Sequence, residues 1–212
     1  LTEIMRGAAD IALNAGAPIL GGHSVEGKDL MTGLAVVGLV DPKKTFQNNK
    51  LKAGDALILT QRLGTGTLTT AVKRGVLSED ALAPVIEAMV RTNAAAVPVL
   101  HRYGIKAATD VTGFALLGHL GEMLKASSLG AIIDMEQVPV FDEARLMLEE
   151  GVKTRANQRN LDYVSGLIPV VGASDELLLD PQTSGGLLVA VPAEHLDDIV
   201  TALKNVGYPY TR

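Results

Sequence analysis

The 212-residue chain contains no cysteine and no tryptophan, and only 3% of its residues are aromatic. Without cysteine, these residues form no disulfide, no thiolate metal site and no cysteine nucleophile. The scarcity of aromatic side chains also argues against a surface on which nucleic-acid bases stack. Thiol chemistry is therefore excluded within the residues given.

An excess of positive charge is missing as well, because 19 Lys and Arg stand against 24 Asp and Glu, for a net charge of −5. Such a surface has no general attraction for nucleic acid or for anionic membranes. A phosphate-bearing ligand must instead be bound by local backbone amides, by a few well-placed cations or through a metal ion. We expect no nucleic-acid partner.

The sequence has no long apolar segment. No stretch approaches the ~18–20 consecutive apolar residues that a membrane-spanning helix needs, and the first residues show no basic region followed by an apolar signal segment. We therefore expect a cytoplasmic protein without a membrane partner. The first residue is leucine rather than methionine, which suggests a piece of a longer protein.

The apolar content is nevertheless sufficient for a sizeable core. Apolar residues make up 47% of the chain and charged residues 20%, which excludes a disordered chain. Apolar runs predict strands at residues 33–40, 55–60, 106–109, 130–135 and 187–191. Helical spacing predicts helices at residues 1–15, about 65–74, 78 to about 98, about 114–125, 142–150 and 194–206.

The alternation of strands and helices predicts an α/β or α+β fold. The basic, asparagine-rich stretch 43–54 is the predicted linker between two parts. The polar stretch 151–164 is predicted to be a loop with a helical turn. Ser78 is the predicted N-cap of the helix that follows it, and Pro98 is expected to kink or end that helix.

Three polar segments flanked by glycine stand beside strand-like stretches: GGHS at 21–24, TDVTG at 109–113 and DPQTSGG at 180–186. Consecutive glycines allow successive N–H groups to point into one concavity, which suits an anion such as phosphate. The alternative is a tight turn without a ligand, which we favour for any double glycine taken alone. His23 either donates to a phosphate, or takes part in acid–base chemistry, or is a turn residue bonded to backbone.

Asp110 is a carboxylate at a predicted strand end, with Thr109 and Thr112 alongside. Oxygen ligands of this kind hold hard divalent cations. The alternative is that Asp110 and Thr112 cap the following helix, and local sequence alone favours the cap. Asp180, before a proline, is either a ligand or the start of a turn, and here we favour the turn.

Two weaker signals complete the candidates. Residues 64–67 (GTGT) resemble a phosphate-binding loop at a helix N-terminus but lack the Gly-Lys-Ser/Thr ending of a Walker motif. Arg159 and Asn160 lie in a polar stretch where an arginine can clamp an anion, although solvated charge is the default interpretation. The other three histidines have no metal-type spacing and are interpreted as structural or surface residues; they are His101, His119 and His195.

Taken together, these segments resemble the selenophosphate synthetases (selenide, water dikinases), which belong to the superfamily of aminoimidazole ribonucleotide synthetase. The matching stretches occur in the family's order and span nearly the whole chain. They are MRGAAD at 5–10, GGHS at 21–24, GLAV at 33–36, LTTA at 68–71, DVTGF at 110–114, LGH at 117–119, Arg159-Asn160 and DPQTSGGLL at 180–188.

The resemblance implies a two-part architecture like that of aminoimidazole ribonucleotide synthetase. Residues 1–45 are then the remnant of a truncated amino-terminal domain that dimerises and binds ATP, and residues 46–212 form a carboxy-terminal α+β domain. The family converts ATP, selenide and water into selenophosphate, AMP and orthophosphate, with Mg²⁺ as cofactor. The resemblance assigns Gly21, Gly22 and His23 to ATP binding across a homodimer interface and Asp110 to magnesium binding.

The same resemblance implies that catalytic groups are missing. The family's catalytic cysteine or selenocysteine, its nearby lysine and its amino-terminal aspartates would all lie upstream of Leu1. Residues 208–212 are similar to a strand cut before its close. We therefore expect this chain alone to be inactive.

Two alternatives stay open. One is another ATP-using member of the superfamily, such as a thiamine-phosphate kinase or a hydrogenase maturation factor. The other is a non-catalytic paralogue with a binding role. The GGHS and DPQTSGGLL segments favour the selenophosphate synthetase.

Overall fold

The computed structural model describes residues 1–170 and 176–212. The chain divides into two units, residues 1–41 and residues 42–212. The first unit contains helix α1 (Thr2–Asn14), which ends before Gly16 at a positive φ of 66°. The rest of this unit has no helix or strand among its residues, all of which are described.

The prediction of a buried strand at residues 33–40 was wrong. No residue of 1–41, all of them described, is buried, and Val37 is 95% exposed. A strand requires a neighbour to share its backbone hydrogen bonds, and residues 1–41 supply none. The apolar run is exposed and has no regular secondary structure.

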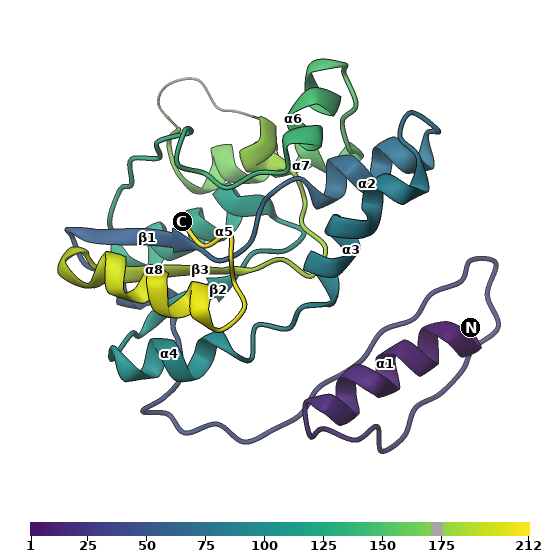
Figure 1. The fold of residues 1–212 in the computed structure, drawn as a ribbon, viewed down its shortest axis with the longest axis horizontal. Helices are drawn as coiled ribbons and strands as arrows, with labels where there is room; N and C mark the ends of the chain where they lie inside the picture. The colour runs from purple at the N-terminus through teal and green to yellow at the C-terminus, as the bar shows by residue number, and fades with distance from the viewer. Residues whose placement is uncertain (171–175) are drawn as a thin grey trace. The chain divides into compact units, whose positions relative to one another are not determined.

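The second unit is built on a three-stranded antiparallel sheet (Figure 1). Its strands are β1 (Asp55–Leu59), β2 (Ala107–Asp110) and β3 (Leu187–Pro192). Their order is β1-β3-β2, with Leu57 opposite Ala190 on one side of β3 and Ala108 opposite Val189 on the other. The strands predicted at residues 55–60, 106–109 and 187–191 are confirmed.

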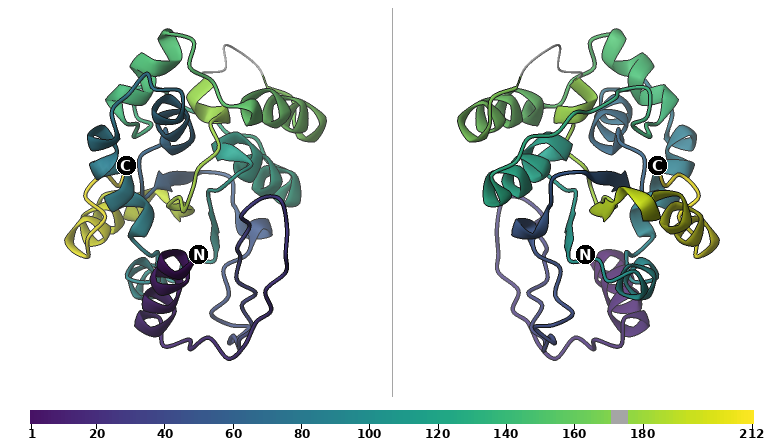
Figure 2. Two further views of the ribbon diagram at one scale, coloured as in Figure 1. Left: turned by 90° about the vertical axis from the view of Figure 1, so that its right-hand side faces the viewer. Right: turned by 90° about the vertical axis from the view of Figure 1, so that its left-hand side faces the viewer.

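Alternate residues of these strands enter two separate cores, as the pleat of a strand requires. Leu59, Leu188 and Ala190 lie in one cluster, whereas Ile58, Val189 and Val191 lie in the other. Helices therefore cover both faces of the sheet (Figure 2).

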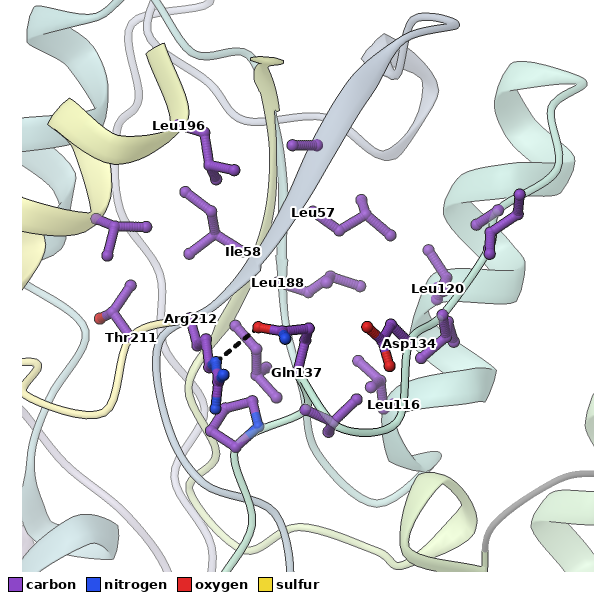
Figure 3. Close-up of a pocket in the computed structure, with 18 of the residues that line it drawn as sticks. Leu57, Ile58, Leu116, Leu120, Asp134, Gln137, Leu188, Leu196, Thr211 and Arg212 are labelled. Atoms are coloured by element: carbon purple, nitrogen blue, oxygen red, sulfur yellow. Dashed lines mark hydrogen bonds between the residues drawn. The ribbon is translucent and has the colours of Figure 1, made fainter. Parts of the chain in front are cut away.

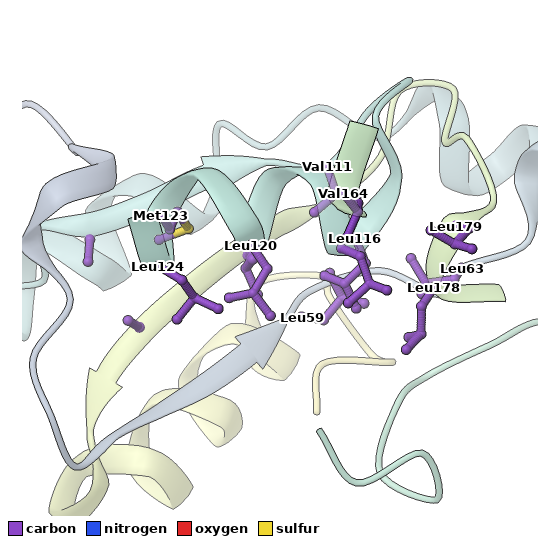
Figure 4. Packing of buried hydrophobic residues seen from close by; sticks show 14 residues of the cluster. Leu59, Leu63, Val111, Leu116, Leu120, Met123, Leu124, Val164, Leu178 and Leu179 are labelled. Carbon is purple, nitrogen blue, oxygen red and sulfur yellow. The ribbon is translucent and has the colours of Figure 1, made fainter. Parts of the chain in front are cut away.

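The first face is covered mainly by α5 (Ala115–Ser127), α7 (Arg155–Leu167) and the 3₁₀ turn η3 (Glu176–Leu179). Figure 4 shows the α5 side chains Leu116, Leu120 and Leu124 pointing toward the strands. The second face is covered by α4 (Ala96–Arg102) and α8 (Leu196–Asn205), with η4 (Ala193–His195) leading into α8. Another 3₁₀ turn, η1 (Asn48–Lys50), precedes β1.

A third apolar cluster lies beside the sheet. It joins α2 (Thr65–Lys73), α3 (Ala83–Val90) and α6 (Asp142–Glu149). Here the predicted long helix from residue 78 is divided into η2 (Glu79–Leu82), α3 and α4. Ser78 makes no side-chain cap bond in the described structure, and Arg91 interrupts the run with extended backbone.

Three other predictions for this unit were wrong. Residues 130–135 form no strand in the described structure, and residues 208–212 form none either, although Arg212 and Leu59 exchange a pair of backbone hydrogen bonds. The predicted loop at 151–164 is mostly helix α7. Thr154 and Asn157 form a reciprocal capping box that begins this helix.

In the part of the chain that is described, no helix is long and apolar enough to cross a membrane.

Candidate functional site

Asp110 is the last residue of β2, and its side chain is exposed. The four residues after it lead directly into α5. Val111 is fully buried and donates its N–H to the carbonyl of Gly186 (2.9 Å), which continues the pairing of β2 with β3. The carboxylate is thus presented to solvent at the end of a buried strand.

The loop after Asp110 is held by three further hydrogen bonds. The Thr112 carbonyl accepts from the N–H of Gln182 (3.0 Å). The Gly113 carbonyl accepts from Nδ2 of Asn160 (3.0 Å), which also donates to the carbonyl of Leu179. The Thr112 N–H donates to Nε2 of His119 (3.0 Å). The loop is fixed to α5, to α7 and to the segment 180–186, so it is a rigid support for one exposed carboxylate.

The double glycine at 185–186 permits a close backbone approach and does not form an open anion nest. A Cβ at Gly185 would lie 1.9 Å from the Val111 carbonyl oxygen. A Cβ at Gly186 would lie 2.6 Å from Thr60 Oγ1, which accepts the N–H of Leu187. The close packing of this glycine pair is in keeping with the interpretation without a ligand, which the sequence favoured for a double glycine taken alone.

Backbone strain gathers on the same segments. Ala115, which follows the Asp110 loop, has a φ of 63°, and Ser184, in the segment 180–186, has a φ of 48°. A non-glycine residue in the left-handed region costs free energy and is retained where surrounding structure imposes it, often at functional sites. This observation supports a functional role for the region around Asp110 independently of sequence resemblance.

The amino terminus of α2 is occupied by the protein's own side chains. Asp180 is fully buried and accepts from the N–H of Gly66 (3.1 Å) and the hydroxyl of Thr67 (2.7 Å). Oε1 of Gln182 accepts from the N–H groups of Gly64 and Thr65. Desolvation raises the pKa of Asp180 to about 6, although these hydrogen bonds oppose the shift.

Two interpretations of the sequence change as a result. The GTGT loop at 64–67 is not a phosphate cradle, because its amides are already paired inside the protein. Asp180 is a buried clamp on the helix terminus and not simply the start of a turn. The satisfied amides favour the carboxylate through the helix dipole and direct hydrogen bonds.

Thr112 does not cap α5 as predicted. In the described structure α5 begins without a side-chain cap bond, and the Thr112 hydroxyl lies 3.2 Å from His119 Nε2. Burial lowers the pKa of His119, opposed by the carboxylates of Asp110 and Glu122. His119 is therefore a structural histidine, as predicted, but its partner is the loop of the candidate site.

An aromatic pair borders the loop. The Phe114 ring is half exposed, stacks on Tyr163 with centroids 4.9 Å apart and meets His119 edge-on at 6.0 Å. The Tyr163 hydroxyl donates to Glu122 (2.6 Å), and this hydrogen bond raises the pKa of Tyr163. The pair fixes the side of the loop that faces α5 and α7.

A magnesium ion fits Asp110 only together with ligands from elsewhere. Among the described residues, no group of three or more His, Cys, Asp or Glu side chains is placed to hold a metal ion. Mg²⁺ is commonly held by one or two carboxylates together with substrate phosphates and waters. An exposed carboxylate on a fixed loop matches that mode of binding.

The predicted ATP-binding residues lie in the other unit. Gly21, Gly22 and His23 belong to an exposed segment without regular structure, and a Cβ at either glycine would meet no described atom within 4 Å. The structure brings Asp110 and the segment 180–186 together within residues 42–212. Arg159 is exposed on α7, whereas Asn160 is buried and holds the Asp110 loop, so the loop interpretation of this pair was wrong.

A separate hollow of about 1370 Å³ lies between β1 and residues 129–140 (Figure 3). Leucines such as Leu57, Leu120 and Leu188 line it, and Arg212 donates to Gln137 across one end. Within the described structure, Asp110 does not belong to this lining. The hollow is therefore distinct from the candidate site.

The sheet, its two helical layers and the Asp110 loop belong to a known class of domain. The family described as "AIR synthase related protein, C-terminal domain" matches residues 52–211, and the chain belongs to this family. The predicted AIR-synthase-like α+β fold is confirmed. A crystal structure of the hydrogenase maturation protein HypE shares this fold, with a TM-score of 0.59 and 18% identity over 82% of this chain and 46% of HypE. Thiamine-monophosphate kinase from Stenotrophomonas maltophilia gives a TM-score of 0.57 and 18% identity over 82% of this chain and 50% of that protein.

Within the family, the chain is similar to proteins named selenide, water dikinase, as predicted. It is 42% identical over 211 residues to the one from Carboxydothermus hydrogenoformans and 39% identical over 211 residues to the one from Clostridioides difficile. Each match covers 98% of this chain and 61% of the relative. The chain thus spans less than two thirds of these relatives.

Proposed function

We propose that this chain is the part of a selenophosphate synthetase that presents Asp110 to a magnesium–nucleotide complex. In the complete reaction ATP, selenide and water give selenophosphate, AMP and orthophosphate. The observation that carries the proposal is the exposed Asp110 carboxylate on a loop whose backbone is held from three sides. The names of the relatives support it, and a HypE structure in complex with ATP supports nucleotide binding on this fold.

Each residue has a limited role in this proposal. A magnesium ion bound at Asp110 would offset the negative charge of the nucleotide phosphates, which this acidic chain does not otherwise attract. Asp110 supplies one oxygen ligand, and its loop keeps that oxygen in place. Gly21, Gly22 and His23 contribute contacts to ATP from a second copy of the chain, in a cytoplasmic homodimer. Residues 1–45 and 46–212 are the corresponding two parts.

Binding of Mg²⁺ with a non-hydrolysable ATP analogue, measured by calorimetry, tests the proposal. We expect Asp110→Asn to weaken binding by about tenfold or more, since it removes a charged metal ligand. Asp198→Asn removes an exposed carboxylate on α8 and is the matched control. Equal affinities for Asp110→Asn and the control would refute the role of Asp110.

We also propose that the chain alone does not turn over ATP, because it holds no cysteine nucleophile. Incubation with ATP, selenide and Mg²⁺ should release no AMP above the background without protein. AMP release with selenide would contradict this. Turnover with thiamine phosphate in place of selenide would favour the alternative of another superfamily kinase.

A further inference from the structure

Among the described residues, the His119 side chain accepts the hydrogen bond of the Thr112 N–H, in the loop that follows Asp110. It lies in the second turn of α5, and its Nε2 is 3.0 Å from the Thr112 nitrogen and 3.2 Å from the Thr112 hydroxyl. An N–H group donates only to a nitrogen that carries no proton. The geometry therefore requires a neutral ring with its proton on Nδ1.

This contact adds a side-chain hydrogen bond to the backbone hydrogen bonds of the loop. The N–H of Val111 pairs with Gly186, and the N–H of Ala115 pairs with the Thr112 carbonyl. Within the described residues, His119 is the acceptor found for the half-buried N–H of Thr112. Without it, a backbone donor two residues from Asp110 would lose its partner, and the loop would gain freedom.

The surroundings hold the ring in this orientation. Phe114 meets it edge-on, and the carboxylates of Asp110 and Glu122 are the charged groups that act on it. Since Nε2 is already bonded to Thr112, His119 is not available through that nitrogen as a metal ligand. Its role is exerted through the loop.

We propose that His119 is a positioning residue for Asp110: its imidazole fixes the Thr112 amide and thereby the direction in which the carboxylate meets the metal–nucleotide complex. The inference rests on the proposed function, because it assumes that Asp110 binds the metal. The same arrangement explains why a Thr and a His seven residues apart in the sequence act together: the loop turns back onto the second turn of the helix.

The first test is spectroscopic and needs no ligand. In nitrogen-15 NMR spectra of the unliganded chain at pH 7.5, we expect the His119 ring to be neutral with the proton on Nδ1. The resonance is assigned by its loss in His119→Gln. A ring protonated on Nε2 would overturn the proposal, because that nitrogen would have no lone pair for Thr112.

The second test measures affinity for Mg²⁺ with the ATP analogue. We expect His119→Leu to weaken binding by about tenfold, in the range found for groups that orient a metal ligand. His119→Gln offers an amide oxygen at a similar reach, and we expect it to bind within about threefold of the unchanged chain. His101→Leu, which removes a histidine bonded to the Lys44 carbonyl, is the control and should bind normally.

The outcomes separate the two proposals. If Asp110→Asn leaves the affinity unchanged, the proposed function fails. If Asp110→Asn weakens binding but His119→Leu does not, only the positioning role fails. If His119→Gln binds as weakly as His119→Leu while both give the far-ultraviolet circular dichroism of the unchanged chain, the acceptor role fails. Should His119→Leu not fold, the protonation state of the His119 ring and the affinity of His119→Gln still test the positioning role.

Discussion

At the scale of single residues, the site depends on positions where main-chain atoms pack too closely for a larger side chain or a ligand. Gly185 and Gly186 allow β3 to reach the Asp110 loop, and buried Asp180 replaces an external anion at the start of α2. The sequence marked these positions as candidates either for ligand binding or for a turn. It did not distinguish a ligand cradle from internal packing, because glycine serves both.

Gly185→Ala should destabilise the fold. The added Cβ would meet the Val111 carbonyl oxygen at 1.9 Å, and backbone atoms on both sides cannot move aside cheaply. We expect the free energy of unfolding in urea to fall by about 3 kcal/mol. Gly113→Ala is the matched control, since its Cβ would meet no described atom within 4 Å, and its effect should stay under about 1 kcal/mol. Equal effects of the two variants would contradict this account.

Asp180 should make stability depend on pH. Its folded pKa is about 6, against an ordinary value of 3.8, because burial penalises the charged form. Between about pH 4 and pH 6 the folded chain keeps a proton that the unfolded chain has released. Raising the pH through this window therefore lowers the stabilisation from this group, by at most about 3 kcal/mol.

The measurement compares the unchanged chain with Asp180→Asn, which does not titrate. The unfolding free energy of the unchanged chain minus that of the variant should become less positive, or more negative, as the pH rises from 4 to 6, and should then level off. A difference that grows over this interval would show that the carboxylate is stabilised in its charged form.

At the scale of elements, periodicity predicted those parts whose packing is visible in the sequence. β1, β2, β3, α5 and α6 were all predicted near their observed bounds. α7 was missed because its sequence is largely polar and its capping box uses Asn157 where Glu or Gln is usual. The strands expected at 33–40 and 130–135 had suitable composition, but strands depend on partners that a local pattern does not reveal.

The end of α5 offers a test at this scale. Ser128 ends the helix in the left-handed region, with a φ of 56°, and its side chain is exposed. Ser128→Gly should raise the free energy of unfolding by about 0.5–1 kcal/mol, because glycine adopts this conformation without strain. Ala126→Gly, two residues earlier inside the helix, should lower it by about the same amount. Thermal melts of both variants check the opposite signs; a loss in both would contradict the assignment.

At the scale of the whole molecule, all the buried residues of the described structure lie in the unit 42–212. The sequence placed one domain boundary in the basic stretch 43–54, and the assignment of residues 1–45 and 46–212 to two domains stays a prediction. The candidate site was found from sequence only in part. Asp110 was named, whereas the contribution of His119 depends on a fold-back that spacing alone does not show.

A chain consisting of residues 42–212 should fold by itself. Since none of residues 1–41, all described, is buried, its unfolding free energy should lie within about 1 kcal/mol of that of the 212-residue chain. Residues 1–41 alone should show little helix, because an isolated helix of 13 residues is marginal in water. Circular dichroism with urea titration checks both, and a non-cooperative 42–212 would contradict the prediction.

The border position of β1 has a practical consequence. In the described structure this strand pairs with β3 along its length and, toward the hollow, with Arg212 at Leu59. Alternate residues of an antiparallel strand point their N–H and C=O groups to the same side of the strand. The N–H and C=O groups of Leu57 therefore point away from β3, as those of Leu59 do. Such an edge strand offers backbone groups with which other polypeptide chains pair. Concentrated samples are therefore expected to aggregate, and a low protein concentration or a solubilising fusion will keep the molecules apart.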